Sequence, residues 1–202
     1  MKKINLSLLS ILFGVVAFLP SCKEEEIQEM YLRGGNSIIQ SDDGNLVIAG
    51  YNSASQNGYE ATLVKTDLNG EVIWSNNFGG TNSDGFFKVE NAHNGGVIAC
   101  GFSFTNSSGA PTMLAVLTNS SGTKEWMKTY ASGYYSQAFS LVKQADSGYV
   151  LAGYIQKNTT SDRDIYIVRI NNEGKEIWSR QYGAKTATPQ DTLYDEAYNN
   201  VA

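Results

Sequence analysis

The chain has 202 residues, of which 15 are lysine or arginine and 20 are aspartate or glutamate, so its formal charge at pH 7 is −5. A nucleic-acid site needs a basic footprint, and this acidic composition does not supply one. With two cysteines, Cys22 and Cys100, and one histidine, the composition also excludes a disulfide-stapled scaffold and a metal site built from several histidines.

Residues 1–21 are typical of a signal peptide. Lys2 and Lys3 supply a positive start, and positions 6–19 form an apolar run too short for a stable membrane-spanning helix, which needs about 20 apolar residues. The run ends at Leu19-Pro-Ser-Cys22, which resembles the lipobox of bacterial lipoproteins. That resemblance implies cleavage before Cys22 and lipidation of this cysteine. A plain secretory signal followed by an incidental cysteine is the alternative.

An acidic tether, residues 22–34, follows the signal. Its first charged residues are Lys23, Glu24, Glu25 and Glu26. Together with the cysteine they resemble the surface-export signal of Gram-negative bacteria that display lipoproteins on the cell surface. The resemblance implies a lipid-anchored protein of the outer membrane, exposed to the outside; the periplasmic face is the alternative. Loss of residues 1–21 removes two lysines, so the mature charge is 13 minus 20, or −7.

Residues 35–202 contain an internal repeat of about 50 residues. Three tryptophans stand 52 residues apart, and each follows a glycine by four positions. The pairs are Gly70 with Trp74, Gly122 with Trp126, and Gly174 with Trp178. A second glycine follows an apolar run in each copy, at Gly50, Gly101 and Gly153. A repeat of this length, built from short β-prone segments, predicts β-propeller blades.

Each copy contains four β-prone segments, which in the first copy are residues 37–40, 46–49, 61–67 and the segment that carries Trp74. Asx and glycine residues favour tight turns after the first and third segments. The second and third segments are joined by a polar loop that differs between copies, and variable loops on a repeated frame often carry binding specificity. The predicted blades span about 35–80, 85–131 and 137–183, and a fourth begins at about 195.

The repeat resembles a known group of proteins. Gly148-Tyr-Val-Leu-Ala-Gly-Tyr154 and Asn171-Asn-Glu-Gly-Lys-Glu-Ile-Trp-Ser179 look like the repeats of bacterial secreted and lipoprotein β-propellers, and the resemblance covers about residues 35–184. The spacing of Asx, glycine and tryptophan is also similar to the tryptophan-docking repeat of quinoprotein dehydrogenases and outer-membrane assembly propellers. The resemblance implies an all-β, β-propeller-type fold of three four-stranded blades plus the start of a fourth. It implies no activity.

The repeated aromatic and turn residues are expected to be structural. A tryptophan ring buries about 150–250 Å², so we expect each one to be buried and to lock neighbouring blades. Asp67-Leu-Asn-Gly70 alternates oxygen atoms like a calcium loop, but position 76 is Asn where an EF-hand needs an acid, so a plain turn is expected. His93 is expected to be an exposed turn residue.

Three carboxylates, Glu60, Asp162 and Asp164, lie near loop-to-strand junctions and are the candidates for hydrolytic chemistry. Glu60, Thr112 and Asp164 occupy equivalent positions, and a position that changes chemistry between copies favours a strand cap over a catalytic pair. We therefore expect no catalytic residue, no cofactor and no metal.

The expected function is a non-catalytic surface or envelope module that binds or scaffolds a glycan or a protein partner. Three loop tyrosines are candidates for stacking on sugar rings: Tyr59, Tyr134 and Tyr135. A polysaccharide hydrolase or lyase on the same scaffold is one alternative, and a purely structural envelope component is another.

The last segment of the chain bears on how the repeats close. Residues 195–201 are similar to the opening of a fourth blade, whereas propellers close with about 4–8 blades. We therefore expect either that the sequence is the N-terminal part of a longer propeller or that it self-associates by pairing with another chain.

Overall fold

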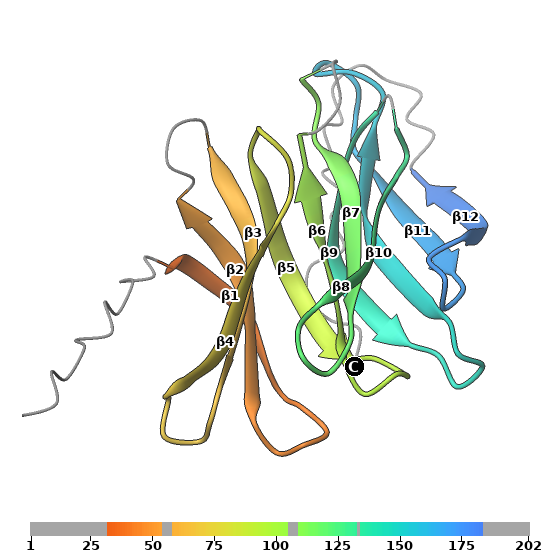
Figure 1. The fold of residues 1–202 in the computed structure, drawn as a ribbon. Helices are drawn as coiled ribbons and strands as arrows, with labels where there is room; N and C mark the ends of the chain where they lie inside the picture. The colour runs from red at the N-terminus through yellow and green to blue at the C-terminus, as the bar shows by residue number, and fades with distance from the viewer. Residues whose placement is uncertain (1–31, 54–57, 105–108, 133, 184–202) are drawn as a thin grey trace, which may run out of the picture.

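The computed structural model describes residues 32–53, 58–104, 109–132 and 134–183, which form twelve β-strands. The strands make three four-stranded antiparallel sheets, each in chain order (Figure 1). Sheet 1 contains β1 (Leu32–Gln40), β2 (Leu46–Ser53), β3 (Tyr59–Thr66) and β4 (Val72–Phe78). Sheet 2 contains β5 (Asp84–Asn91), β6 (Val97–Ser103), β7 (Thr112–Thr118) and β8 (Lys124–Tyr130). Sheet 3 contains β9 (Tyr135–Lys143), β10 (Tyr149–Gln156), β11 (Asp164–Ile170) and β12 (Glu176–Tyr182).

These sheets confirm the prediction of an all-β protein with repeated four-stranded units. Tight turns join the first two and the last two strands of each sheet at one end, here called the turn end (Figure 1). The opposite end carries the polar loops and the links between sheets, and is called the loop end. In the turn after β3, Asp67 Oδ1 accepts hydrogen bonds from the backbone amides of Asn69 at 2.8 Å and Glu71 at 2.9 Å. The aspartate thus stabilises the turn, as an Asx residue does.

The glycine that recurs in the second strand of each sheet is required for a steric reason. A Cβ atom built on Gly50, Gly101 or Gly153 would lie only 1.8–1.9 Å from a carbonyl oxygen of the neighbouring first strand of its sheet. In each sheet the pairing of the first two strands shifts register there, which leaves one bulged residue. The bulged residues are Asn36, Phe87 and Phe139. Only glycine lets the second strand approach the bulge so closely.

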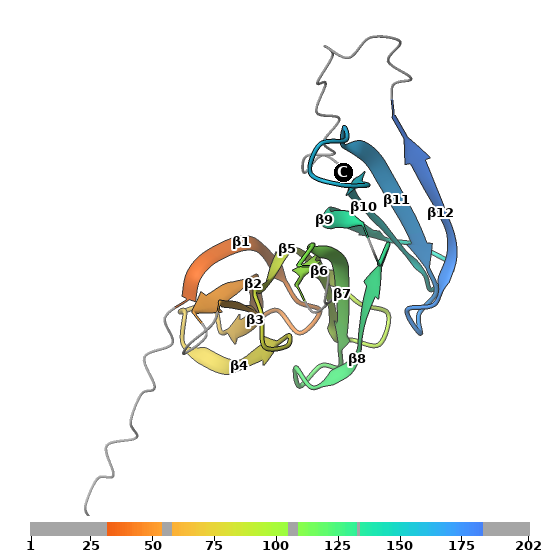
Figure 2. The ribbon, with the colours of Figure 1, turned by 90° about the horizontal axis from the view of Figure 1, so that it is seen from above.

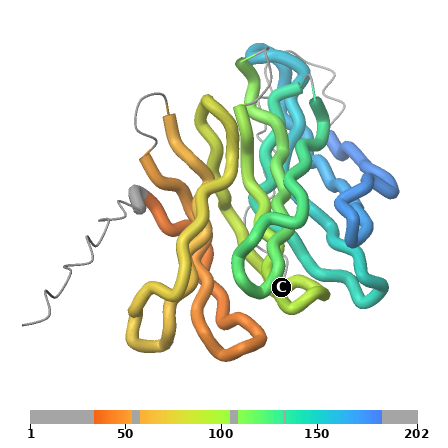
Figure 3. The backbone as a smooth tube through the Cα atoms, viewed as in Figure 1, coloured from red at the N-terminus to blue at the C-terminus, as the bar shows by residue number. Residues whose placement is uncertain are grey.

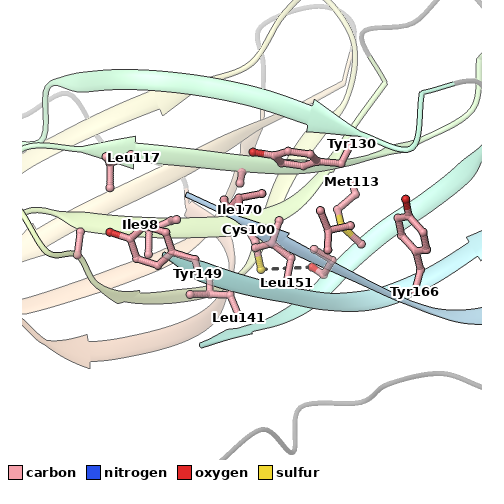
Figure 4. Packing of buried hydrophobic residues seen from close by; sticks show 14 of the residues in the cluster. Ile98, Cys100, Met113, Leu117, Tyr130, Leu141, Tyr149, Leu151, Tyr166 and Ile170 are labelled. Atoms are coloured by element: carbon pink, nitrogen blue, oxygen red, sulfur yellow. Dashed lines mark hydrogen bonds between the residues drawn. The ribbon is translucent and has the colours of Figure 1, made fainter. Parts of the chain in front are cut away.

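Two hydrophobic cores lie on the two faces of sheet 2. Leu114 and Val116 of β7 pack in the core shared with sheet 1, whereas Met113, Ala115 and Leu117 pack in the core shared with sheet 3. Figure 4 shows part of the second core, in which Cys100 is fully buried. Because both faces of its sheet are covered, β7 has no exposed residue.

The three sheets fan around a common side, with β1, β5 and β9 toward it and β4, β8 and β12 away from it (Figure 2). Figure 3 follows the same backbone from the first sheet, in orange, to the last, in blue. Sheets 1 and 3 do not meet, so the described residues do not form a closed propeller ring. The predicted signal peptide, Cys22, the charged residues 23–26 and the fourth blade from about 195 lie outside the described residues.

Candidate functional site

The repeated tryptophans lie at the turn end, between consecutive sheets. A Cβ atom on Gly122 would lie 2.8 Å from the Trp74 ring, and one on Gly174 would lie 3.1 Å from the Trp126 ring. Each of these rings therefore packs on the turn glycine of the next sheet. Trp74, Trp126 and Trp178 are half-buried and not fully buried as predicted. Each lies on the outermost strand of its sheet, which leaves one side of the ring near solvent.

The contact between sheets 2 and 3 also contains a row of hydrogen bonds, here called the donor ladder. Trp126 Nε1 donates to Asn172 O at 2.9 Å, Lys128 Nζ donates to Glu173 O at 2.6 Å, and the Tyr130 hydroxyl donates to Gly174 O at 2.8 Å. Three alternate residues of one strand thus satisfy three successive carbonyls of one turn. This arrangement joins neighbouring sheets and offers no group for chemistry.

A groove of about 340 Å³ lies at the equivalent contact between sheets 1 and 2. It lies between β4 and the turn that leads into β8. Its lining residues are Trp74, Asn76, Asn77, Phe78, Ser121, Gly122, Thr123 and Lys124. Asn76 Nδ2 donates to Gly122 O across it at 3.0 Å. The groove has a volume in the range of ligand sites, but Lys124 is the one charged side chain among its lining residues.

A second candidate, nearer the loop end, is a continuous series of aromatic rings, here called the aromatic row. It comprises Phe104, Phe102, Phe87, Phe139 and Tyr154. Successive ring centroids lie 5.8, 5.4, 5.1 and 5.8 Å apart, within the range of favourable aromatic pairs. The row crosses from sheet 2 to sheet 3, and the Arg163 guanidinium lies 4.4 Å from the Tyr154 ring centroid at its end.

The aromatic row is separate from both cores. None of its five rings belongs to either core cluster; its four phenylalanines are half-buried, whereas Tyr154 is 4% exposed. Phe87 and Phe139 are the bulged residues of β5 and β9, and bulges re-aim side chains next to functional sites. Phe104 N donates to Ser83 O at 3.1 Å, which ties the end of the row to the link between sheets 1 and 2. The row therefore has a defined backbone support.

A buried carboxylate lies at that same link. Asp84 is fully buried, and its Oδ2 accepts a hydrogen bond from Gly80 N at 2.8 Å. A Cβ atom on Gly79 would lie 2.1 Å from the same oxygen, so glycine is required for the link to fold over the carboxylate. Burial raises the pKa of Asp84 above its usual value, against the opposing effect of hydrogen bonds from Ser103 and Gly80. The residue organises the link.

Two of the three carboxylates considered for hydrolysis, Glu60 and Asp164, act within their own sheets, whereas the third, Asp162, is exposed. Asn77 Nδ2 donates to Glu60 Oε2 at 2.7 Å, and Gln181 donates to Asp164 in the equivalent position of sheet 3. The Thr112 hydroxyl donates to Ser103 O at 3.1 Å. These contacts agree with the strand-cap interpretation.

The other candidates are dispersed. Tyr59 and Tyr134 are exposed, Tyr135 is half-buried, and Tyr59 pairs edge-on with Tyr51 at 5.0 Å. His93 is exposed in the turn after β5, as predicted. Sequence reasoning did not identify the aromatic row, although Phe87 and Phe139 recur one repeat apart directly opposite the repeated glycines. The recurrence of a phenylalanine opposite this glycine was the sequence signal that could have indicated the row.

The thiol of Cys100 has no reactive setting. It is fully buried, and its Sγ lies 3.7 Å from Ala138 O (Figure 4). Burial raises the pKa of this thiol far above its usual value, so the reactive thiolate is disfavoured.

No family model matches the chain, and no curated protein matches it. Among the described residues, no helix is long and apolar enough to cross a bilayer. Within the same residues, no three histidine, cysteine or carboxylate side chains gather as a metal site.

Proposed function

We propose that this protein is a non-catalytic binding module that holds a glycan on the aromatic row. The single observation that carries the proposal is the presence of five contacting rings that belong to neither core. The four phenylalanines keep part of their apolar surface in contact with water, and a ligand that covers this surface gains free energy in proportion to the apolar area removed from water. The row therefore differs from ordinary interior packing.

A glycan fits the chemistry around the row. Aromatic side chains combine an apolar face with low conformational entropy, and such faces cover the C–H surface of a sugar ring. The loop beside Arg163 contributes amide and hydroxyl groups: Asn158 and Thr160 are exposed, and Ser161 is half-buried. Polar groups around an apolar strip orient a ligand and give specificity. A protein partner is the other candidate, and the test below distinguishes the two.

Glycan arrays probed with the purified chain provide the test. Phe87→Ala and Phe104→Ala remove rings from the middle and the end of the row, so both variants should lose at least about tenfold in affinity for any bound glycan. Lys124→Ala changes the groove at the turn end and is the matched control, which should bind as the wild type does. The near-ultraviolet circular dichroism of each variant checks its fold.

Each alternative gives a different result. Release of products from polysaccharide mixtures would indicate the hydrolase or lyase. Absence of glycan binding together with capture of a protein that depends on Phe87 would establish a protein ligand. Absence of any ligand would leave a structural envelope component. Glycan binding that survives both phenylalanine variants would place the site elsewhere.

We further propose that the module is lipid-anchored at the outer membrane and faces outward. The support is the sequence around Cys22 and the charged residues 23–26, and several acyl chains give stable anchoring. Cys22→Ser should abolish incorporation of a fatty-acid analogue. Replacement of residues 23–26 by alanine should keep the lipid but protect the protein from protease added to whole cells. Unchanged accessibility after that replacement would reject the export role.

A further inference from the structure

The three kinds of donor side chain of the donor ladder recur on β12, the outer strand of sheet 3. On β12, Trp178, Arg180 and Tyr182 occupy the positions that Trp126, Lys128 and Tyr130 occupy on β8. The cation lies over the ring in both sheets, at 5.9 Å for Lys128 over Trp126 and 5.7 Å for Arg180 over Trp178. No described residue of another sheet accepts a hydrogen bond from this second set of donors.

The exposure of Tyr182 shows how β12 differs from β8. Tyr130 is 6% exposed because its ring and hydroxyl contact the next sheet, whereas Tyr182 is 54% exposed. Trp178 is also accompanied by an exposed apolar neighbour, Ile177. The outer strand of sheet 3 therefore presents the same surface that sheet 2 uses, but without a described partner.

The complementary turn, Asp67–Gly70 of sheet 1, packs on no tryptophan among the described residues. A Cβ atom on Gly122 or Gly174 would meet a tryptophan ring, whereas one on Gly70 would have nothing within 4 Å. Leu68 in the same turn is 68% exposed. The turn has the same internal geometry as the occupied ones, with Gly70 N donating to Asp67 O at 3.2 Å and Gly174 N donating to Asn171 O at 2.9 Å. The carbonyls of Leu68, Asn69 and Gly70 are equivalent in sequence to the three that accept in the donor ladder.

Charge adds to this match. The sheet 1 turn carries Asp67 and Glu71, and hydrogen bonds from Glu71 N and Asn69 lower the pKa of Asp67, so it stays ionised at neutral pH. Arg180 on β12 is exposed. Opposite charges on two surfaces favour their encounter and fix their register.

We propose that two copies of this chain associate head to tail, with Trp178, Arg180 and Tyr182 of one copy seated on the Asp67–Gly70 turn of the next. The expected hydrogen bonds follow the donor ladder: Trp178 Nε1 to Leu68 O, Arg180 to Asn69 O, and the Tyr182 hydroxyl to Gly70 O. A contact between two different surfaces propagates until it closes into a ring. Ile38 of β1 is 59% exposed and Ile167 of β11 is half-buried, and neither belongs to a core cluster, so the association can cover apolar surface on sheets 1 and 3 as well.

The experiment compares masses of the full chain by light scattering, in mild detergent with micelles in excess over protein. Gly70→Asn keeps a residue that tolerates positive φ but places a side chain on the docking surface. Gly44→Asn is the matched control, because Gly44 also has a positive φ and open space around it. Arg180→Glu changes an exposed residue on the other surface and should not affect folding.

The wild type and Gly44→Asn should associate, whereas Gly70→Asn and Arg180→Glu should each lose at least about tenfold in association. An equimolar mixture of these two variants should form dimers and nothing larger, because one pair of surfaces remains intact. The wild-type association should weaken as salt increases. A monomeric wild type, equal behaviour of the two glycine variants, or a mixture that stays monomeric would each overturn the proposal.

Discussion

The contact between sheets 1 and 2 and the contact between sheets 2 and 3 use the same repeat, but the second is closed more tightly. Between sheets 2 and 3, three side chains donate to three turn carbonyls. Between sheets 1 and 2, Asn76, in the position of Lys128, donates to Gly122 O, the carbonyl equivalent to the one that Tyr130 reaches, while Trp74 Nε1 is buried and no described residue accepts its hydrogen. Phe78, in place of Tyr130, carries no hydroxyl to reach the turn.

The two cores also differ in how many polar groups they contain, and the core between sheets 2 and 3 again has more. The core between sheets 2 and 3 contains Tyr130, Tyr149 and Tyr166, whereas the other core is built from Val, Ala, Leu and Phe. The Tyr149 hydroxyl accepts a hydrogen bond from His93 N at 3.2 Å and donates to Asn172 Oδ1 at 3.3 Å. Burial raises the pKa of both Tyr130 and Tyr149. A few residue differences between the repeats thus separate a contact closed by side-chain hydrogen bonds, between sheets 2 and 3, from one that leaves a groove, between sheets 1 and 2.

The largest expected effect comes from removing the tryptophans. Trp126→Ala removes packing on Gly174 and the bond to Asn172, so it should lower the free energy of unfolding by about 3 kcal/mol, the lower end for such substitutions because the ring is half-buried. Trp74→Ala removes only packing and should cost about 1 kcal/mol less.

Urea denaturation of both variants measures this difference. Tyr134→Phe, which changes an exposed tyrosine, is the control and should leave stability unchanged. Equal losses for Trp74 and Trp126 would mean that the indole hydrogen bond contributes nothing to the tighter contact.

A smaller effect is expected from exchanging the last rung of the ladder. Tyr130→Phe leaves the Gly174 carbonyl without its buried donor and should cost about 1–2 kcal/mol. Phe78→Tyr places a hydroxyl in the groove near Gly122 and should change stability by less than about 1 kcal/mol. Urea denaturation of each variant beside the wild type then gives the contribution of the hydroxyl to the free energy of unfolding in each contact. If both exchanges are neutral, the hydroxyl is not what distinguishes the contacts.

The sequence predicts the repeated architecture well because its signals are local. The glycines of the Asx turns and the glycines opposite the bulges are dictated by backbone geometry, which depends on few neighbours. The tightness of each contact was not predictable in this way. It depends on whether the side chain at position 76 or 128 reaches a turn some 45 residues later in the chain, as Lys128 does to Glu173. The aromatic row was missed for the same reason, since ring contacts between β5 and β9 form only after the sheets pack.

The smallest expected effect on stability concerns the difference between the two links that join the sheets. The first link contains the buried Asp84, whereas the equivalent position in the second link is Ser136, which is equally buried but neutral. Met113 N donates to Ser136 Oγ at 3.0 Å, so a neutral group can organise a link. The pKa of folded Asp84 is raised by burial, so folding favours its protonated form. Its contribution to stability is therefore complete below the unfolded pKa of about 4 and is lost as pH rises through the folded pKa.

Asp84→Asn tests this by removing the charge while keeping an oxygen that can accept from Gly80 N. The stability of the wild type minus that of the variant should fall as pH rises above about 4 and then become constant, in thermal or urea unfolding at fixed ionic strength. Asp43→Asn is the control of opposite sign, because Lys65 at 2.6 Å lowers the pKa of Asp43 and its contribution is lost as pH falls. A difference for Asp84→Asn that does not change with pH would show that the carboxylate titrates alike in the folded and unfolded chain. The two links would then differ in shape but not in charge.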